Sequence, residues 1–91
     1  MAFEKEVKIR NKTGMHAKPA ADFVKKVNQY SSAISVSFDG KEVNAKDVMA
    51  LMGLGVAKGN QITIKAEGDN AKTIVEEIIT FVENDMVKND Y

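Results

Sequence analysis

The chain has no cysteine and no tryptophan, and its 91 residues include only one proline and one histidine. Without cysteine it can form neither disulfides nor thiolate metal sites. Its 13 basic and 13 acidic residues give a formal net charge of zero, so nucleic acid is not an expected partner. No apolar run is long enough for a membrane span or a secretory leader. We expect a soluble cytoplasmic protein with no membrane insertion, folded as one domain over residues 1–91.

Several short segments have the pattern of half-buried strands. Apolar and polar residues alternate over residues 3–9, 34–38 and 62–67, as they do when one face of a sheet is buried. The pair Asp39-Gly40 is a strong hairpin signal and predicts a further strand over residues 41–43. Four strands are therefore expected.

Segments with helical periodicity lie between these strands and after the last one. One helix is predicted to run from His16 through Gln29, a short one over Asp47 to Met52, and a long one over residues 71–82. The resulting order, β-α-β-β-α-β-α, predicts an α+β fold with a four-stranded antiparallel sheet and helices on one face. The pattern alone also admits a ferredoxin-like sheet. Residues 88–91 are expected to form a frayed end.

The stretch from Asn11 to Ala20, N-K-T-G-M-H-A-K-P-A, holds both single-copy residues. Gly14 permits a tight turn, and Pro19 suits the first turn of a helix, so His16 is expected where a loop becomes a helix. Unpaired N–H groups, the helix dipole and Lys18 would then form an anion site beside a nucleophile. Alternatively, His16 is only a helix cap or a surface side chain without a catalytic role. No second histidine or acidic cluster lies nearby, so neither a metal nor a cofactor is expected.

The segment T-G-M-H-A-K-P-A resembles the active-site signature G-[IL]-H-A-R-P-A of the HPr family. HPr is the histidine-containing phosphocarrier of the bacterial phosphoenolpyruvate-dependent sugar phosphotransferase system. The later stretch K-E-V-N-A-K-D-V-M-A-L-M-G-L-G-V also falls in family order. The resemblance implies an open-faced β-sandwich in which the Nδ1 atom of His16 accepts a phosphoryl group. It also implies that the backbone amides of Ala17 and Lys18 bind the phosphoryl oxygens.

The same resemblance implies a role and a set of partners. The protein would be a monomeric phosphocarrier, not an enzyme with a small substrate, that takes a phosphoryl group from enzyme I and gives it to enzyme II A domains. Its partner surface would combine residues near the histidine with one face of the short helix: Met15, Ala20, Val48, Met49 and Met52. Alternatively, the methionines of the short helix only fill gaps in the core.

Two positions depart from the family pattern. Lys18 replaces an arginine, which keeps a positive charge but loses a planar, two-pronged donor. Asp47 stands where many relatives have a regulatory serine. It can be explained as an acid in the first turn of a helix capped by Asn44, or as a partial imitation of a phosphoserine. A regulatory HPr-like binding module and a nitrogen-related phosphotransferase paralogue therefore stay open as alternatives. An RNA-binding domain is disfavoured by the zero net charge.

Overall fold

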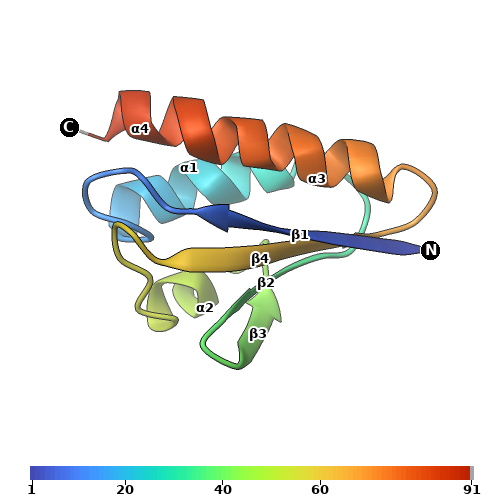
Figure 1. Cartoon of the computed structure of the whole chain (residues 1–91), viewed down its shortest axis with the longest axis horizontal. Coiled ribbons are helices and arrows are strands. Elements are labelled where there is room, and N and C mark those ends of the chain that lie inside the picture. Colours follow the sequence, from blue (N-terminus) through green and yellow to red (C-terminus); the bar gives the residue numbers. More distant parts are fainter. Residues whose placement is uncertain (91) are drawn as a thin grey trace.

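A computed structural model describes residues 1–90. Tyr91, which belongs to the predicted domain and to the predicted frayed end, lies outside the described residues. The elements follow the predicted order, with the last helix continued by two further helical segments (Figure 1). Their bounds are β1 Ala2–Lys8, α1 Ala17–Val27, β2 Ile34–Phe38, β3 Lys41–Asn44, α2 Val48–Gly53, β4 Gln61–Glu67, α3 Ala71–Thr80, the π-helix η1 Phe81–Asp85, and α4 Met86–Asn89.

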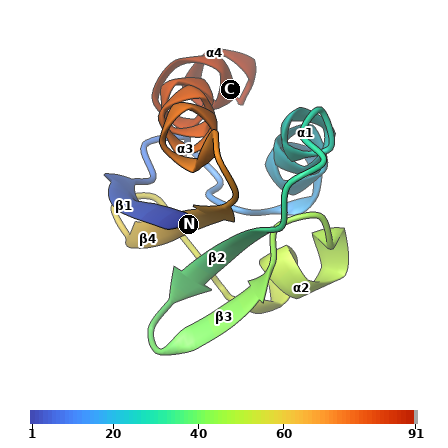
Figure 2. The same cartoon turned by 90° about the vertical axis from the view of Figure 1, so that its right-hand side faces the viewer.

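The four strands form one sheet in the order β1-β4-β2-β3, and every neighbouring pair is antiparallel. The register places Ile64 opposite Val36 and Ile62 opposite Val7, so that the apolar positions share one face. Helices α1 and α3 cover this face, while the other face stays open (Figure 2). The predicted open-faced sandwich is confirmed. A ferredoxin-like sheet is excluded by the strand order: its split βαβ units place the first and third strands in the centre, whereas β1 and β3 lie at the two edges here.

Helix α1 buries the predicted stripe of Ala20, Phe23, Val24 and Val27 against the sheet. It ends at Val27, two residues before the predicted end at Gln29. Past this point the N–H groups of Gln29 and Tyr30 each bind a carbonyl three residues back, at 3.1 Å. Such tighter bonds satisfy the last carbonyls of a helix without prolonging it.

Tyr30, just beyond α1, connects this helix to α3. Its hydroxyl donates a hydrogen bond of 2.5 Å to Glu77 Oε1, and the Lys26 ammonium lies 5.4 Å from the centre of its ring. Burial and the bond to Glu77 raise the pKa of Tyr30 above its ordinary value. The two long helices are therefore linked by polar contacts at the edge of the core.

The helical region at the end of the chain is longer than predicted. The side chain of Asn84 donates to the Thr80 carbonyl at 2.9 Å, and this bond accompanies the π-helical turn of η1. Val82 and Met86 remain buried, so the segment packs as a continuation of α3. The prediction of a frayed end is wrong for Lys88 and Asn89, because α4 continues to Asn89.

Candidate functional site

His16 is the N-cap of α1, as expected for a loop that becomes a helix there. Its backbone is extended, with φ −84° and ψ −175°, and its carbonyl accepts the hydrogen bond of Ala20 N–H at 2.8 Å. The side chain is exposed and makes no capping hydrogen bond. Histidine here does not serve as a side-chain cap, so the imidazole is available to a reacting group.

The first turn of α1 supplies hydrogen-bond donors directly beside this imidazole. Ala17 and Lys18 are the first two helical residues, and N–H groups at these positions have no carbonyl within the helix to bind. The next residue is Pro19, which has no N–H and is buried. Neither amide donates to a backbone carbonyl of residues 1–90, and together with the positive end of the helix dipole they are suited to bind an anion. A histidine in this setting can act as a nucleophile toward phosphorus.

The ammonium group of Lys18 is already engaged. Its Nζ atom lies 3.0 Å from Asp22 Oδ2, one turn further along α1, and 3.4 Å from the Asn89 carbonyl at the end of α4. The Lys18 side chain is 70% exposed, and exposed ion pairs of this kind are weak. The lysine can therefore exchange these partners for an anion beside His16 at small cost.

The loop before His16 packs closely on the segment that follows α2. Gly14 has φ +66°, and a Cβ atom added there would lie 2.3 Å from the Val56 carbonyl oxygen. The same carbonyl accepts the Met15 N–H at 3.1 Å. Glycine is required at position 14 for both reasons, since the backbone there is left-handed and the neighbouring chain leaves no room.

A second contact holds this loop from the other end of the chain. The Oδ2 atom of Asp90 accepts three hydrogen bonds: from Thr13 N at 2.8 Å, Thr13 Oγ1 at 2.7 Å and Asn11 Nδ2 at 2.8 Å. These donors, first of all the Thr13 amide, hold the pKa of Asp90 below its ordinary value. The sequence carries no local signal for this contact, because the partners are 77 to 79 residues apart.

Two residues of the predicted partner surface are not on the surface. Met15 is 3% exposed and Ala20 is fully buried. Met15 faces the core because its loop is bonded to Val56, and Ala20 lies on the apolar stripe of α1. The prediction is wrong for both. Their exposed neighbours are Ala17 and Ala21.

The other predicted surface residues lie on α2. Met49 is 76% exposed, whereas Val48 and Met52 are half-buried and contact the core. Only Leu51 of this helix is fully covered. Helix α2, which carries the exposed Met49, packs beside α1, and this helix and the loop before α1 lie toward the same end of the molecule (Figure 1).

Asp47 is itself the N-cap of α2. Its Oδ1 atom accepts the Ala50 N–H at 3.1 Å. Asn44, which was expected to be the cap, instead accepts the Lys46 N–H at 2.9 Å within the preceding turn. The helix begins one residue later than predicted, at Val48, and this shift moves Asp47 from the first turn to the capping position.

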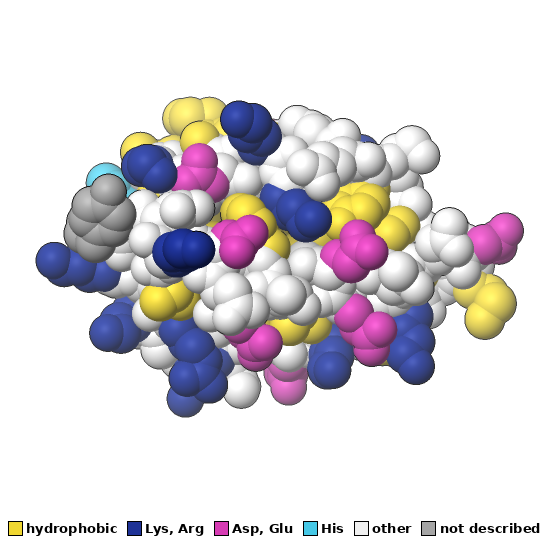
Figure 3. Space-filling view, turned by 90° about the horizontal axis from the view of Figure 1, so that it is seen from above, with side chains coloured by type: hydrophobic (Ala, Val, Ile, Leu, Met, Phe, Trp, Pro, Cys, Tyr) yellow, Lys and Arg dark blue, Asp and Glu magenta, His cyan; other side chains and the backbone are white. Residues whose placement is uncertain are grey.

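The end of the molecule that carries His16 is rich in basic side chains. It gathers the loop between β1 and α1, the loop between α2 and β4, and the end of α4 (Figure 1). Figure 3 shows Lys and Arg side chains gathered at one end of the helical face. The exposed basic residues of these segments are Arg10, Lys12, Lys58 and Lys88, and the exposed Lys18 lies in the adjoining first turn of α1. Such a surface favours the approach of anionic groups.

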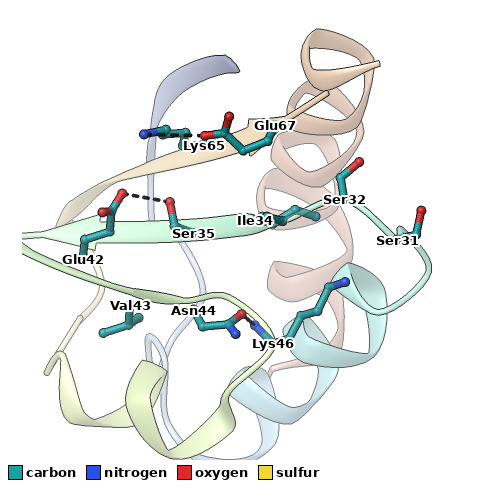
Figure 4. A pocket seen from close by; sticks show the side chains of 11 residues that line it. Ser31, Ser32, Ile34, Ser35, Glu42, Val43, Asn44, Lys46, Lys65 and Glu67 are labelled. Carbon is teal, nitrogen blue, oxygen red and sulfur yellow. Dashed lines mark hydrogen bonds and ion pairs between the residues drawn. The ribbon is translucent and has the colours of Figure 1, made fainter. Parts of the chain in front are cut away.

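A polar hollow lies elsewhere, beside the open face of the sheet. It is a shallow depression of about 560 Å³, lined by polar side chains that include Ser35, Glu42 and Lys65 (Figure 4). Ser35 donates to Glu42 within it at 3.0 Å. None of the predicted site residues lines it. Among residues 1–90, no helix is long and apolar enough to cross a membrane, and no cluster of three metal-ligating side chains occurs.

The structure thus presents one exposed histidine at the free N-terminus of a helix, on an open-faced α+β sandwich. Residues 3–84 match the family model described as the PTS HPr component phosphorylation site. The chain belongs to the HPr family of the phosphotransferase system.

Some of the proteins that are similar to this chain are named HPr-like protein Crh, and others are named phosphocarrier protein HPr. The HPr-like protein Crh of Halalkalibacterium halodurans is 43% identical over 82 residues, which cover 90% of this chain and 98% of that protein. The phosphocarrier protein HPr of Vibrio cholerae is 40% identical over 81 residues, covering 89% and 95%. A crystal structure of HPr from Thermoanaerobacter tengcongensis superposes with a TM-score of 0.86 at 42% identity, covering 92% and 94% of the two chains.

Proposed function

We propose that this protein carries a phosphoryl group on the Nδ1 atom of His16. It accepts the group from enzyme I that phosphoenolpyruvate has phosphorylated, and passes it to sugar-specific enzyme II A domains during sugar uptake. It acts in the cytoplasm as one HPr-like domain, residues 1–91, and turns over no small substrate of its own. The observation that carries the proposal is the exposed, uncapped imidazole of His16 directly before the two free N–H groups of α1.

The proposed transfer is balanced at each step. The Nδ1 lone pair of His16 attacks the phosphorus, so that a new P–N bond forms while the P–N bond to the donor's histidine breaks. Negative charge is spread over the three phosphoryl oxygens. The N–H groups of Ala17 and Lys18 can stabilise this charge without moving, because the helix already holds them in place. The exposure of His16 lets a second protein bring its own histidine to the same phosphorus.

Lys18 has a supporting role in this proposal. Its backbone N–H binds a phosphoryl oxygen, and its ammonium adds a mobile positive charge once it leaves Asp22. A lysine binds phosphate as a point charge and lacks the two-pronged geometry of arginine. Transfer should therefore depend on Lys18 less strictly than it depends on His16.

A regulatory HPr-like module is the second candidate. It is favoured by the similarity to Crh, which bears the name HPr-like protein, and by Asp47 at the position of a regulatory serine in relatives. In that case the α2 face around Met49 would bind a partner whether or not His16 is phosphorylated. A nitrogen-related phosphotransferase paralogue would use the same histidine with different partners. The alternatives and the first candidate differ in the partner proteins that donate or accept the phosphoryl group.

Intact-protein mass spectrometry tests the proposal directly. The protein is incubated with phosphoenolpyruvate and enzyme I, then treated with acid, and the modified residue is mapped. We expect one acid-labile phosphoryl group on His16, none on His16→Ala, and slower modification of Lys18→Ala. A wild-type protein that stays unmodified beside a competent HPr control would overturn the carrier role. Transfer of the phosphoryl group from the modified protein to a sugar-specific enzyme II A domain is then measured. Transfer favours a role in sugar uptake over the nitrogen-related paralogue.

We further propose that the protein acts as a monomer. Strand β1 pairs along its whole length with β4 of the same chain, and the backbone bonds of Ile9 to Gly59 and Asn60 hold the segment that follows it. A crystal structure of Bacillus subtilis Crh, 38% identical with a TM-score of 0.72, is described as a swapped dimer. Light scattering after size-exclusion chromatography distinguishes the two, and a 20 kDa species at micromolar concentration would contradict the monomer.

A further inference from the structure

The contact between Asp90 and the loop before His16 is the densest polar contact between distant parts of the described chain. One carboxylate oxygen accepts three hydrogen bonds of 2.7 to 2.8 Å from Asn11 and Thr13. Hydrogen bonds to an ionised acceptor are roughly twice as strong as neutral ones. Asn11 is also the only buried polar side chain of the described residues. So many donors on one oxygen indicate a specific role for Asp90.

The donors lie within the loop that leads to the reacting residue. Asn11 Nδ2 also donates to the Gly14 carbonyl at 2.8 Å, and Gly14 N–H approaches the Asn11 carbonyl at 3.3 Å. Asp90 therefore holds a closed turn over residues 11–14, whose last residue packs on Val56. His16 follows two residues later. A change in this turn is transmitted to the N-cap through only one intervening residue, Met15, which is itself fixed in the core.

We propose that Asp90 is a positioning residue for phosphoryl transfer. Its carboxylate orders the turn of Asn11 and Thr13, and this turn sets the orientation of the His16 imidazole relative to the free N–H groups of α1. The inference rests on the proposed phosphocarrier function. It gives the end of α4 a role in the reaction, in addition to the packing of this helix through Met86.

A merely structural contact would have different consequences. It would lower the stability of the fold in proportion to the lost hydrogen bonds, yet leave the rate of transfer unchanged at temperatures where the protein is folded. A positioning residue changes the rate of the chemical step and leaves partner binding intact, because the exposed surface around Met49 is not altered. The test therefore needs kcat and KM separately, together with a direct observation of the loop.

The experiment compares Asp90→Ala with Asp85→Ala, a matched control. Asp85 lies in η1, is exposed and accepts no side-chain hydrogen bond from the described residues, so its removal changes the net charge equally. Steady-state phosphorylation by enzyme I is measured well below the unfolding temperature of each variant. We expect kcat to fall roughly three- to tenfold for Asp90→Ala with KM unchanged, since small misplacements of a reacting group have effects of this order or larger. Asp90→Asn, which keeps an acceptor oxygen, should recover part of the loss.

Nuclear magnetic resonance supplies the second readout. The Thr13 amide should lose its protection from hydrogen exchange in Asp90→Ala but not in Asp85→Ala, and the ring resonances of His16 should shift only in the former. Loss of Thr13 protection with an unchanged kcat would overturn the positioning role, as would an equal loss of kcat in the control. If wild-type protein accepts no phosphoryl group, the proposed function fails and the positioning role with it, while the Thr13 amide still reports whether Asp90 orders the turn.

Discussion

The ammonium of Lys18 lies 3.0 Å from the Asp22 carboxylate on the next turn of α1. The ion pair holds the cation that belongs to the proposed phosphoryl site, and Asp22 competes with a phosphoryl group for it. The pair is on the surface, so its contribution to the stability of the fold is about 0.5 kcal/mol or less. Its effect on transfer can therefore be separated from its effect on folding.

Removal of this competitor should accelerate phosphoryl acceptance. We expect Asp22→Ala to be modified up to about twofold faster than wild type, the factor that corresponds to roughly 0.4 kcal/mol of recovered charge interaction. The rate is measured by quenched-flow phosphorylation with enzyme I. The control is the double variant Lys18→Ala/Asp22→Ala, which should be no faster than Lys18→Ala alone. An equal gain in the double variant would show that Asp22 acts by its own charge and not through Lys18.

Gly14→Ala should be strongly destabilising. Its Cβ would meet the Val56 carbonyl at 2.3 Å, and φ is +66°, so the loop must move and the free energy of unfolding should fall by about 2–4 kcal/mol. Urea denaturation measures this change. Gly53→Ala is the matched control, because its Cβ would meet nothing within 4 Å and alanine is favoured in a helix by about 0.5–1 kcal/mol. Equal stability of the two variants would contradict the close packing at position 14.

Asp47 can be tested as a cap and as a regulatory feature in one series. Asp47→Ala removes the acceptor of the Ala50 N–H and should cost about 1 kcal/mol, whereas Asp47→Ser keeps a capping oxygen and should stay within a few tenths. Denaturation curves measure both. Affinities of the serine variant for each partner are then compared with wild type. Unchanged affinities favour the cap alone, and a changed affinity at unchanged stability would mean that a partner contacts the carboxylate.

The Asp90 contact should make stability depend on pH in acid. Hydrogen bonds from Thr13 and Asn11 lower the pKa of Asp90 in the folded protein below its ordinary value of 3.8. The stabilisation is therefore fully present above that ordinary value and is lost as the pH falls through the lower, folded-state pKa. We expect Asp90→Ala to unfold at a lower temperature than wild type at pH 7, and the gap to narrow below about pH 4. A gap that is constant down to pH 2 would contradict an ionised Asp90 as the acceptor.

Much of the fold could be predicted from local patterns. Alternation of apolar residues placed the strands, and the stripe at Ala20, Phe23, Val24 and Val27 placed the first long helix, because burial on one face imposes a period on the sequence. The order of the strands within the predicted antiparallel sheet depends on the pairing of β1 with β4. That pairing joins segments about 60 residues apart, and no local pattern encodes it.

The candidate site also combines features that the sequence predicts with features that only the tertiary structure sets. His16 at a helix start, with Gly14 before it and Pro19 after it, was predictable because glycine and proline constrain their own backbone directly. The burial of Met15 and Ala20 was not predictable from their apolar character, since an apolar residue near a reactive histidine can face either the core or a partner. The bond to Val56 and the direction of the α1 stripe decide between the two.

The sequence by itself determined the order of the elements and the position of His16 at a helix N-terminus, because these depend on residue chemistry and short-range geometry. Only the tertiary structure decided what holds them in place. Asp90 reaches Asn11 and Thr13, Lys18 reaches the Asn89 carbonyl, and Gly14 meets Val56. Each of these contacts joins residues more than 40 positions apart, and they form only because the packed sheet and helices bring the end of α4, the loop before α1 and the segment after α2 to one end of the molecule (Figure 1).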